Sequence, residues 1–244
     1  MGKAKRSDGR RVDELRAVKI TPGYVGTADG SCLFEIGGTR VICTASLVEG
    51  VEQWRRGSQL GWVTAEYAML PASTGARKAR RTSRPDGRSV EIQRLIGRVL
   101  RGVVRFEKLG ENTMYLDCDV LEADGGTRTA AINGAYVALA LAAERCAARE
   151  LIRPGAVRGA VGAVSVGIVD GRELLDLDYA EDAVAEADMN VAMTSAGKFV
   201  EVQGAAERGA FTRAQLDRML ALAGKGIRRL LKVQRQAIRR GIRP

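Results

Sequence analysis

The stretch "LEADGGTRTAAINGAYVALALA", residues 121–142, carries two glycines, a threonine and an arginine between a strand-like and a helix-like segment. The first N–H groups of a helix have no partners within it, and with a hydroxyl and a guanidinium beside them they can bind an anion. The Gly-Gly-Thr-Arg stretch at 125–128 therefore outlines an anion site, although glycines also occur at such turns for steric reasons alone. The same tetrapeptide at 37–40 lies between two β-rich runs, which is typical of a hairpin turn.

Six carboxylates and no basic residue occupy the stretch "DLDYAEDAVAEAD", residues 176–188, which we call the acid island. Carboxylates can hold Mg²⁺ or move a proton at a leaving oxygen, whereas a charge run can also be a solvated helix face. Asp182 and Asp188 flank a turn that leads into strand-like "MNVAMT". We expect these two acids to converge.

The chain contains no histidine, so histidine acid–base chemistry is excluded. Its four cysteines form no C-x-x-C pair, which argues against a structural zinc site. No apolar run reaches the length of a membrane span, and no apolar segment follows the charged N-terminus. We expect a cytoplasmic protein with reduced, buried thiols.

The net charge of +10 favours a polyanionic partner, with an ordinary basic surface as the alternative. Residues 77–88 carry six basic groups against one acidic, without apolar periodicity, and are predicted to form a loop. Residues 225–243 carry eight basic groups and no acid. Together with the anion site and the acids, this pattern fits phosphate chemistry on RNA or DNA.

The apolar periods predict the elements that position these groups. A turn at Gly37-Gly38 places Cys32 opposite Cys43. Ser89 is a fair cap for an amphipathic helix with apolar residues from 92 to 103, which puts Arg88 just before its first turn. "NTMYLDCDVL" alternates like a strand, and a long helix follows the second tetrapeptide despite the cost of Gly134.

The remaining third of the chain predicts hairpins at Asp170-Gly171 and near Gly197. Thr212 and Gln215 form a capping box before a final long helix. The predicted order is three strands, helix, strand and helix, then three strands and a helix. This is an α+β fold with sheets and helices in layers, and we expect residues 1–244 to form one domain.

Five segments resemble the bacterial ribonuclease PH family, and the resemblance runs nearly end to end. They are "RSDGRRVDELR" at 6–16, "GWVTAEYAMLP" at 61–71, "EIQRLIGRVLR" at 91–101, "LDCDVLEADGGTRTAAING" at 116–134 and "DLDYAEDAVAEADMNVAMT" at 176–194. The resemblance implies a single ribonuclease PH-type core. It also implies that the chain trims 3′ extensions of transfer RNA precursors with inorganic phosphate and releases nucleoside diphosphates, the reverse reaction adding nucleotides.

The resemblance also implies roles for particular residues. Arg88, Gly126, Thr127 and Arg128 would hold the phosphate, while Asp182 and Asp188 would bind Mg²⁺ and act in catalysis. The first tetrapeptide, 37–40, corresponds to no catalytic element. A phosphate nucleophile arrives already charged, which explains how a chain without histidine can be a nuclease.

The family assembles as a ring of six, a trimer of dimers, and its basic loop contributes to transfer RNA binding. Arg77, Arg80 and Arg81 are the candidates here, although Ala72 stands where the family usually has arginine. Two alternatives remain open, namely a phosphorolytic subunit of the archaeal exosome type and a ring subunit that binds RNA without cutting it.

Overall fold

The fold consists of two β-sheets that pack against shared helices. We describe a computed structural model of residues 6–77, 79 and 86–242. Its first sheet has the order β1-β2-β3-β5-β4 and its second the order β7-β6-β8-β9. The strands of the first are β1 (Val18–Pro22), β2 (Gly30–Ile36), β3 (Thr39–Glu49), β4 (Trp62–Met69) and β5 (Asn112–Glu122), and those of the second are β6 (Val161–Val169), β7 (Arg172–Leu175), β8 (Ala187–Thr194) and β9 (Phe199–Ala206).

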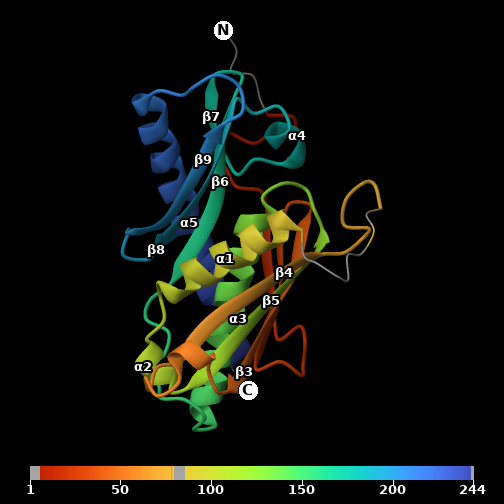
Figure 1. Ribbon diagram of the computed structural model, residues 1–244. Coiled ribbons are helices and arrows are strands. Elements are labelled where there is room, and N and C mark those ends of the chain that lie inside the picture. Colours follow the sequence, from red (N-terminus) through yellow and green to blue (C-terminus); the bar gives the residue numbers. More distant parts are fainter. Residues whose placement is uncertain (1–5, 78, 80–85, 243–244) are drawn as a thin grey trace.

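The first sheet confirms the predicted hairpin. β2 and β3 pair around Gly37 and Gly38, and Cys32 lies opposite Cys43 as free thiols. On β5 the alternating apolar residues from Met114 to Val120 are buried. β4 runs parallel to β5, because α1 (Gly87–Arg101) and the short α2 (Phe106–Leu109) carry the chain back between them (Figure 1).

The second sheet is antiparallel and contains both predicted hairpins. The sequence predicts three strands before the first helix and three before the last, whereas the structure has four in each of these two runs. In the first run the additional strand is β1, five residues long, whose burial does not alternate clearly. In the second run the two hairpins give four strands where three were predicted.

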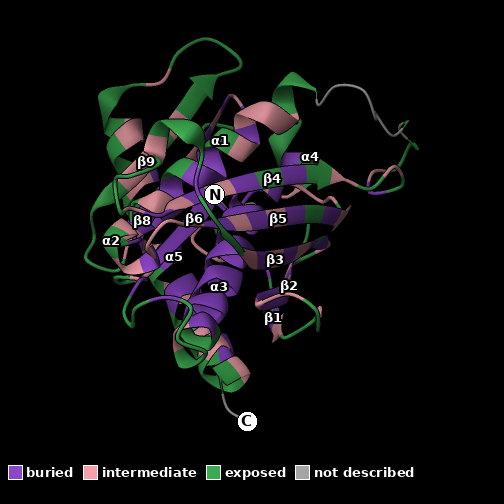
Figure 2. Cartoon of the chain, turned by 60° about the horizontal axis from the view of Figure 1, so that its bottom comes forward, coloured by how far each residue is buried: buried purple, intermediate pink, exposed green. Residues whose placement is uncertain are grey.

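The core is centred on α3 (Thr127–Ala148), which contacts strands of both sheets. Every residue from 129 to 143 is buried, as Figure 2 shows, so the helix has no polar face. A Cβ at Gly134 would lie 2.5 Å from the Cys43 sulfur, and glycine there lets α3 approach the first sheet closely. Packing therefore offsets the helix propensity lost at Gly134.

The last helix, α5 (Arg213–Ile242), packs on β6, β7, β1 and α3. Its capping box is confirmed, because Thr212 and Gln215 exchange backbone-to-side-chain hydrogen bonds of 2.8 and 3.3 Å. Among the described residues, no helix combines the length and apolar character that crossing a membrane requires.

Candidate functional site

The second Gly-Gly-Thr-Arg forms the turn between β5 and α3, as predicted. Gly125 and Gly126 have φ angles of 73° and 66°, and Gly126 caps α3 without any side-chain hydrogen bond to the helix amides. The first N–H groups of α3 therefore keep their capacity to bind an anion, and the helix dipole adds partial positive charge. Thr127 and Arg128 lie in this first turn.

Gly125 fixes this turn against the segment that leads to α4 (Tyr179–Asp182). A Cβ at Gly125 would lie 2.6–2.8 Å from backbone atoms of Leu177, Asp178 and Tyr179. Only glycine fits this approach and the left-handed φ angle together. The anion-binding turn and the helix that carries Asp182 are thus in direct backbone contact.

The Thr127 hydroxyl has a defined orientation. Tyr67, buried near the end of β4, donates a hydrogen bond of 3.0 Å to Thr127 Oγ1. Because that oxygen is an acceptor here, its own proton remains available to a bound anion. Burial raises the pKa of Tyr67, against opposing effects of the Thr127 hydrogen bond and the charges of Arg88 and Arg128, so its donor proton is retained at neutral pH.

Arg128 is held by α1. Its Nη2 lies 3.0 Å from Glu91 Oε2, and Gln203 on β9 donates to the other oxygen of Glu91 at 3.2 Å. The Arg128 Nε is buried and has no hydrogen-bond partner among the described residues. Arg128 therefore has a charged donor that no described residue uses.

Arg88 lies inside the first turn of α1, not before it. The helix begins at Gly87, and its cap is Asp86, whose carboxylate accepts from the Ser89 N–H at 2.7 Å. The prediction of Ser89 as cap was therefore wrong by three positions, because a carboxylate three residues earlier takes that amide. Arg88 is exposed and close enough to influence the titration of both Tyr67 and Asp182.

Asp182 ends α4 and Asp188 lies near the start of β8. Partial burial raises the pKa of Asp182, opposed by the charges of Arg88 and Arg128. Burial likewise raises the pKa of Asp188, and repulsion from Asp182 and Glu207 adds to it. The structure thus brings both acids and both arginines into one electrostatic cluster, with the two acids near each other as predicted.

The rest of the acid island has another task. Arg6 Nε donates to Glu181 at 2.6 Å, Arg16 forms hydrogen bonds of 2.7 and 3.0 Å with Asp176, and Arg10 approaches Asp178 at 3.7 Å. These three arginines belong to the N-terminal segment, which runs beside β7 and α4 (Figure 1). Half of the island therefore anchors the N-terminus, and the solvated-face alternative does not describe these three acids.

The donor set suits a magnesium ion only in part. Two carboxylates are typical of Mg²⁺ sites that complete their shell with water and substrate phosphate. Within the described ranges, no group of three or more acids or thiols is placed to hold a metal ion by itself. The Asp182 carboxylate has no hydrogen-bond or salt-bridge partner among the described residues, so it is available as a ligand.

The predicted RNA-binding loop is described only in part. Arg77 is exposed and lies outside any helix or strand, whereas Arg80 and Arg81 fall outside the described residues. Ala72, also exposed, lies between the end of β4 and this loop.

Four residues near the site were not predicted from the sequence: Tyr67, Glu91, Arg16 and Glu207. Tyr67 could have been found, since it lies in a strand whose alternation places it on the buried face. The others act through contacts between distant segments, and nothing in their local spacing identifies them.

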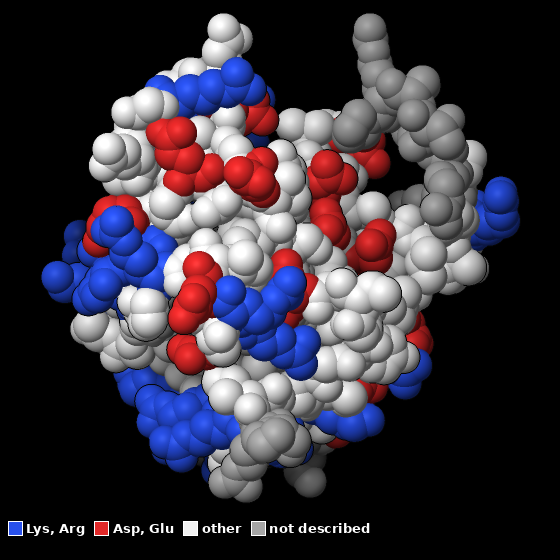
Figure 3. Space-filling view, turned by 90° about the horizontal axis from the view of Figure 1, so that it is seen from below, with Lys and Arg blue, Asp and Glu red and all other residues white. Residues whose placement is uncertain are grey.

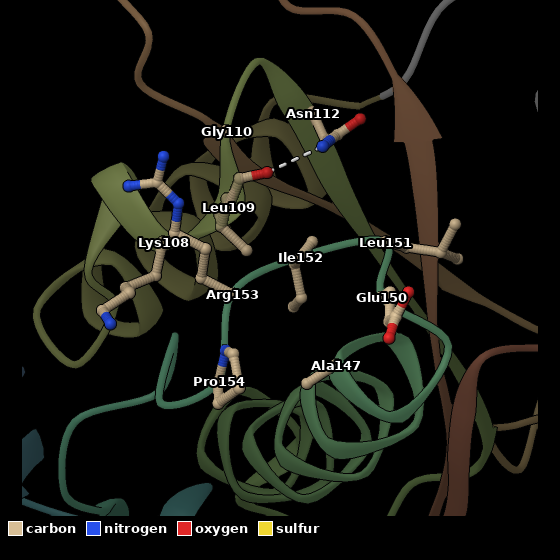
Figure 4. A pocket seen from close by; sticks show the side chains of 10 residues that line it. All are labelled: Lys108, Leu109, Gly110, Asn112, Ala147, Glu150, Leu151, Ile152, Arg153 and Pro154. Carbon is tan, nitrogen blue, oxygen red and sulfur yellow. Dashed lines mark hydrogen bonds between the residues drawn. The ribbon is translucent and has the colours of Figure 1, made fainter.

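A cavity of about 490 Å³ lies elsewhere, between α2 and the C-terminal end of α3. Figure 4 shows Lys108 and Arg153 on its rim, with the Asn112 amide donating to the Leu109 carbonyl. A helix of 22 residues spans about 33 Å, so the length of α3 separates this cavity from the anion-binding turn. It is not part of the candidate site.

Comparison of the sequence with known families gives two matches. The 3′ exoribonuclease family, domain 1, matches residues 14–143, and domain 2 of the same family matches residues 159–226. A protein named ribonuclease PH from Rhodococcus erythropolis is 54% identical over 236 residues, covering 96% of this chain and 90% of that one. Ribonuclease PH from Neisseria meningitidis is 52% identical, covering 94% of this chain and 96% of its own length.

Comparison of the fold gives a concordant result. A chain from a solved structure described as an Archaeoglobus fulgidus exosome with RNA bound to the active site superposes with a TM-score of 0.81 at 23% identity. The match covers 93% of this chain and 92% of that one. At this identity the likeness establishes the α+β fold.

Proposed function

The chain belongs to the 3′ exoribonuclease family and is a phosphate-dependent 3′ exoribonuclease, and we propose that the α3 turn holds its attacking phosphate. The observation that carries this assignment is the unpaired N-terminus of α3 beside Arg128, Arg88 and two acids of raised pKa. Amides and guanidinium groups offset the repulsion between phosphate and an RNA backbone.

The chemistry follows from these groups. A phosphate oxygen bound at Gly126, Thr127, Arg128 and Arg88 forms a bond to the terminal phosphorus of the RNA. The bond from that phosphorus to the 3′ oxygen of the preceding nucleotide breaks, and this oxygen takes up a proton. The products are a nucleoside diphosphate and an RNA one nucleotide shorter, and the reverse reaction adds a nucleotide.

Asp182 and Asp188 supply the proton and bind Mg²⁺ in this proposal. An acid whose pKa is raised holds its proton closer to neutral pH, which suits it to protonate a leaving oxygen. When bound, Mg²⁺ supplies positive charge for the developing negative charge on the phosphate oxygens.

We propose transfer RNA precursors as the substrate, with Arg77, Arg80 and Arg81 contacting the RNA. Support comes from the exposure of Arg77 and the excess of basic residues in 77–88. The lower face of the molecule also carries Lys and Arg in several separate groups with acids between them (Figure 3), so net charge alone does not locate the RNA path.

We further propose a homohexamer, a trimer of dimers, in a reducing cytoplasm. β9 is an edge strand with Phe199 and Val202 about half exposed, and such apolar residues on a sheet edge favour burial against another subunit. The four buried cysteines are free thiols, which supports a reducing compartment. Molar mass by light scattering tests the assembly.

The test of the function uses a transfer RNA with a short 3′ extension, Mg²⁺ and the protein, with and without inorganic phosphate. We expect nucleoside diphosphates only when phosphate is present. Monophosphates without phosphate would identify a hydrolase and remove the proposed mechanism. Tight RNA binding without release would favour the non-catalytic ring subunit.

A further inference from the structure

The first Gly-Gly-Thr-Arg touches the second. Thr39, the first residue of β3, is fully buried, and its hydroxyl lies against the turn between β5 and α3. The hydroxyl donates to the Gly125 carbonyl at 2.7 Å and accepts from the Asp124 N–H at 2.9 Å. One side chain therefore satisfies two backbone groups on either side of the Asp124–Gly125 peptide bond.

The hairpin turn is shaped for this contact. A Cβ at Gly38 would lie 2.9 Å from an Asp124 carboxylate oxygen and 3.0 Å from the Asp124 Cβ, so a larger residue in that position would displace the Asp124 side chain. From the other side, Arg16 donates to the Asp124 carbonyl while its guanidinium is fixed by Asp176. The turn is thus held between Thr39 and Arg16.

A turn with two consecutive left-handed glycines needs such support. Glycine has the largest backbone freedom of any residue, and an anion site loses affinity when its amides must be ordered on binding. The turn lacks a side-chain cap of its own at Gly126. The two hydrogen bonds of Thr39 supply order that the glycines do not.

We infer that Thr39 is a positioning residue for the phosphate site: it touches no substrate but holds the Asp124–Gly125 peptide so that the first amides of α3 face the phosphate. This inference rests on the proposed binding of phosphate at that turn. The tetrapeptide at 37–40 thus contacts the one at 125–128 through Gly38 and Thr39.

The test is Thr39→Val, which keeps the shape and removes the hydroxyl. Because two hydrogen bonds to the turn are lost, we expect the KM for inorganic phosphate to rise about tenfold or more. The Kd for RNA should be unchanged. Thr39→Ser restores the hydroxyl and is expected to return the KM for phosphate to within about threefold. If Thr39→Val does not fold, Thr39→Cys replaces it, because a thiol has similar size and is only a weak donor.

Thr113→Val is the matched control. Thr113 is also buried in the first sheet, and its hydroxyl donates to the Gly50 carbonyl at 2.8 Å, away from the site. We expect it to lower Tm without changing the KM for phosphate. An equal effect of both variants on the KM for phosphate would reduce Thr39 to a structural role and overturn the inference.

Failure of the Thr39 role and failure of the phosphate site give different results in the same experiment. If Arg128→Ala raises the KM for phosphate and Thr39→Val does not, the inference about Thr39 fails while the phosphate site stands. If neither raises it, the proposed phosphate site itself is wrong.

Discussion

At the scale of single residues, the site depends on keeping like and unlike charges close together. Asp182 and Asp188 repel each other and are partly removed from water, while Arg128 favours the ionised form of both. The pKa of each acid is raised in spite of the arginine. Both acids therefore cost the folded state stability once they are ionised.

Asp182→Asn and Asp188→Asn are expected to separate stability from activity. Each acid has an ordinary pKa of 3.8 and a higher value in the folded protein, so folding binds protons and stability falls as pH rises from 3.8 through the raised value. At pH 7 the asparagine variants should melt at higher temperature than the parent protein. Turnover should fall by about a hundredfold or more, as expected when an acid catalyst is lost.

Thermal unfolding at pH 7 and at pH 3, with light scattering to check assembly, measures the stability effect. The gain in Tm should shrink as pH falls through the raised pKa values and disappear well below pH 3.8, where the aspartates are protonated in both states. Near-normal turnover of either variant would remove that residue from the mechanism, and a lower Tm at pH 7 would show that its charge is stabilising.

Arg128→Ala should weaken the use of phosphate far more than the binding of RNA. It removes a guanidinium from the anion site. It also removes the positive charge that lies 3.0 Å from the Glu91 carboxylate. We expect kcat/KM for phosphate to fall about a hundredfold or more. Arg213→Ala, which removes an exposed arginine from α5, serves as control for the lost net charge. Equal losses for phosphate and RNA would mean that Arg128 positions RNA.

At the scale of elements, the site exists because the β5–α3 turn and α4 share one backbone contact at Gly125. Gly125→Ala would place a methyl group 2.6 Å from the carbonyl carbon of Asp178 and add about 1 kcal/mol for a left-handed alanine. The helix that carries Asp182 would have to move. We expect turnover per folded molecule to fall, in addition to any decrease in the amount of folded protein.

Gly171→Ala isolates the backbone cost. Gly171 also has a positive φ, 68°, but a Cβ there would meet nothing within 4 Å. Urea unfolding should show a similar loss of about 1 kcal/mol in this variant, with unchanged turnover. If Gly125→Ala had the same turnover as Gly171→Ala, the contact with α4 would not position the site.

The elements could be predicted where a pattern within a few residues determines them. The turn at 125–128 could be predicted because its motif is contiguous in the sequence. The hairpin at 37–38, the alternating β5 and the capping box at Thr212 follow from spacing over a few residues. The cap of α1 was misplaced, because Asp86 and Ser89 are both good caps and their competition depends on backbone geometry. The pairing of Arg6 and Arg16 with the acid island spans 160 residues or more, and sequence spacing contains no information on it.

At the scale of the whole molecule, the question is whether the chain folds as one unit, as we propose, or as two domains like the two family matches. Buried residues from both sheets and from α1, α3 and α5 form one continuous cluster, which supports one unit. Asn133 of α3 provides a polar link. Its side chain donates to the Ala163 carbonyl at 2.7 Å and accepts from the Ala163 N–H at 3.0 Å and from Gln234 at 2.9 Å.

Asn133→Leu tests this unity, because it would leave buried polar groups of β6 and α5 without partners. We expect a loss of about 3 kcal/mol in unfolding free energy, since each orphaned group costs roughly 1–3 kcal/mol. Tryptophan fluorescence reports only the first half of the chain, where Trp54 and Trp62 lie, while far-UV circular dichroism reports all helices including α5. In one cooperative unit both signals should shift together to lower temperature. If the fluorescence transition stayed in place while the dichroism split in two, the second sheet and α5 would form a domain of their own.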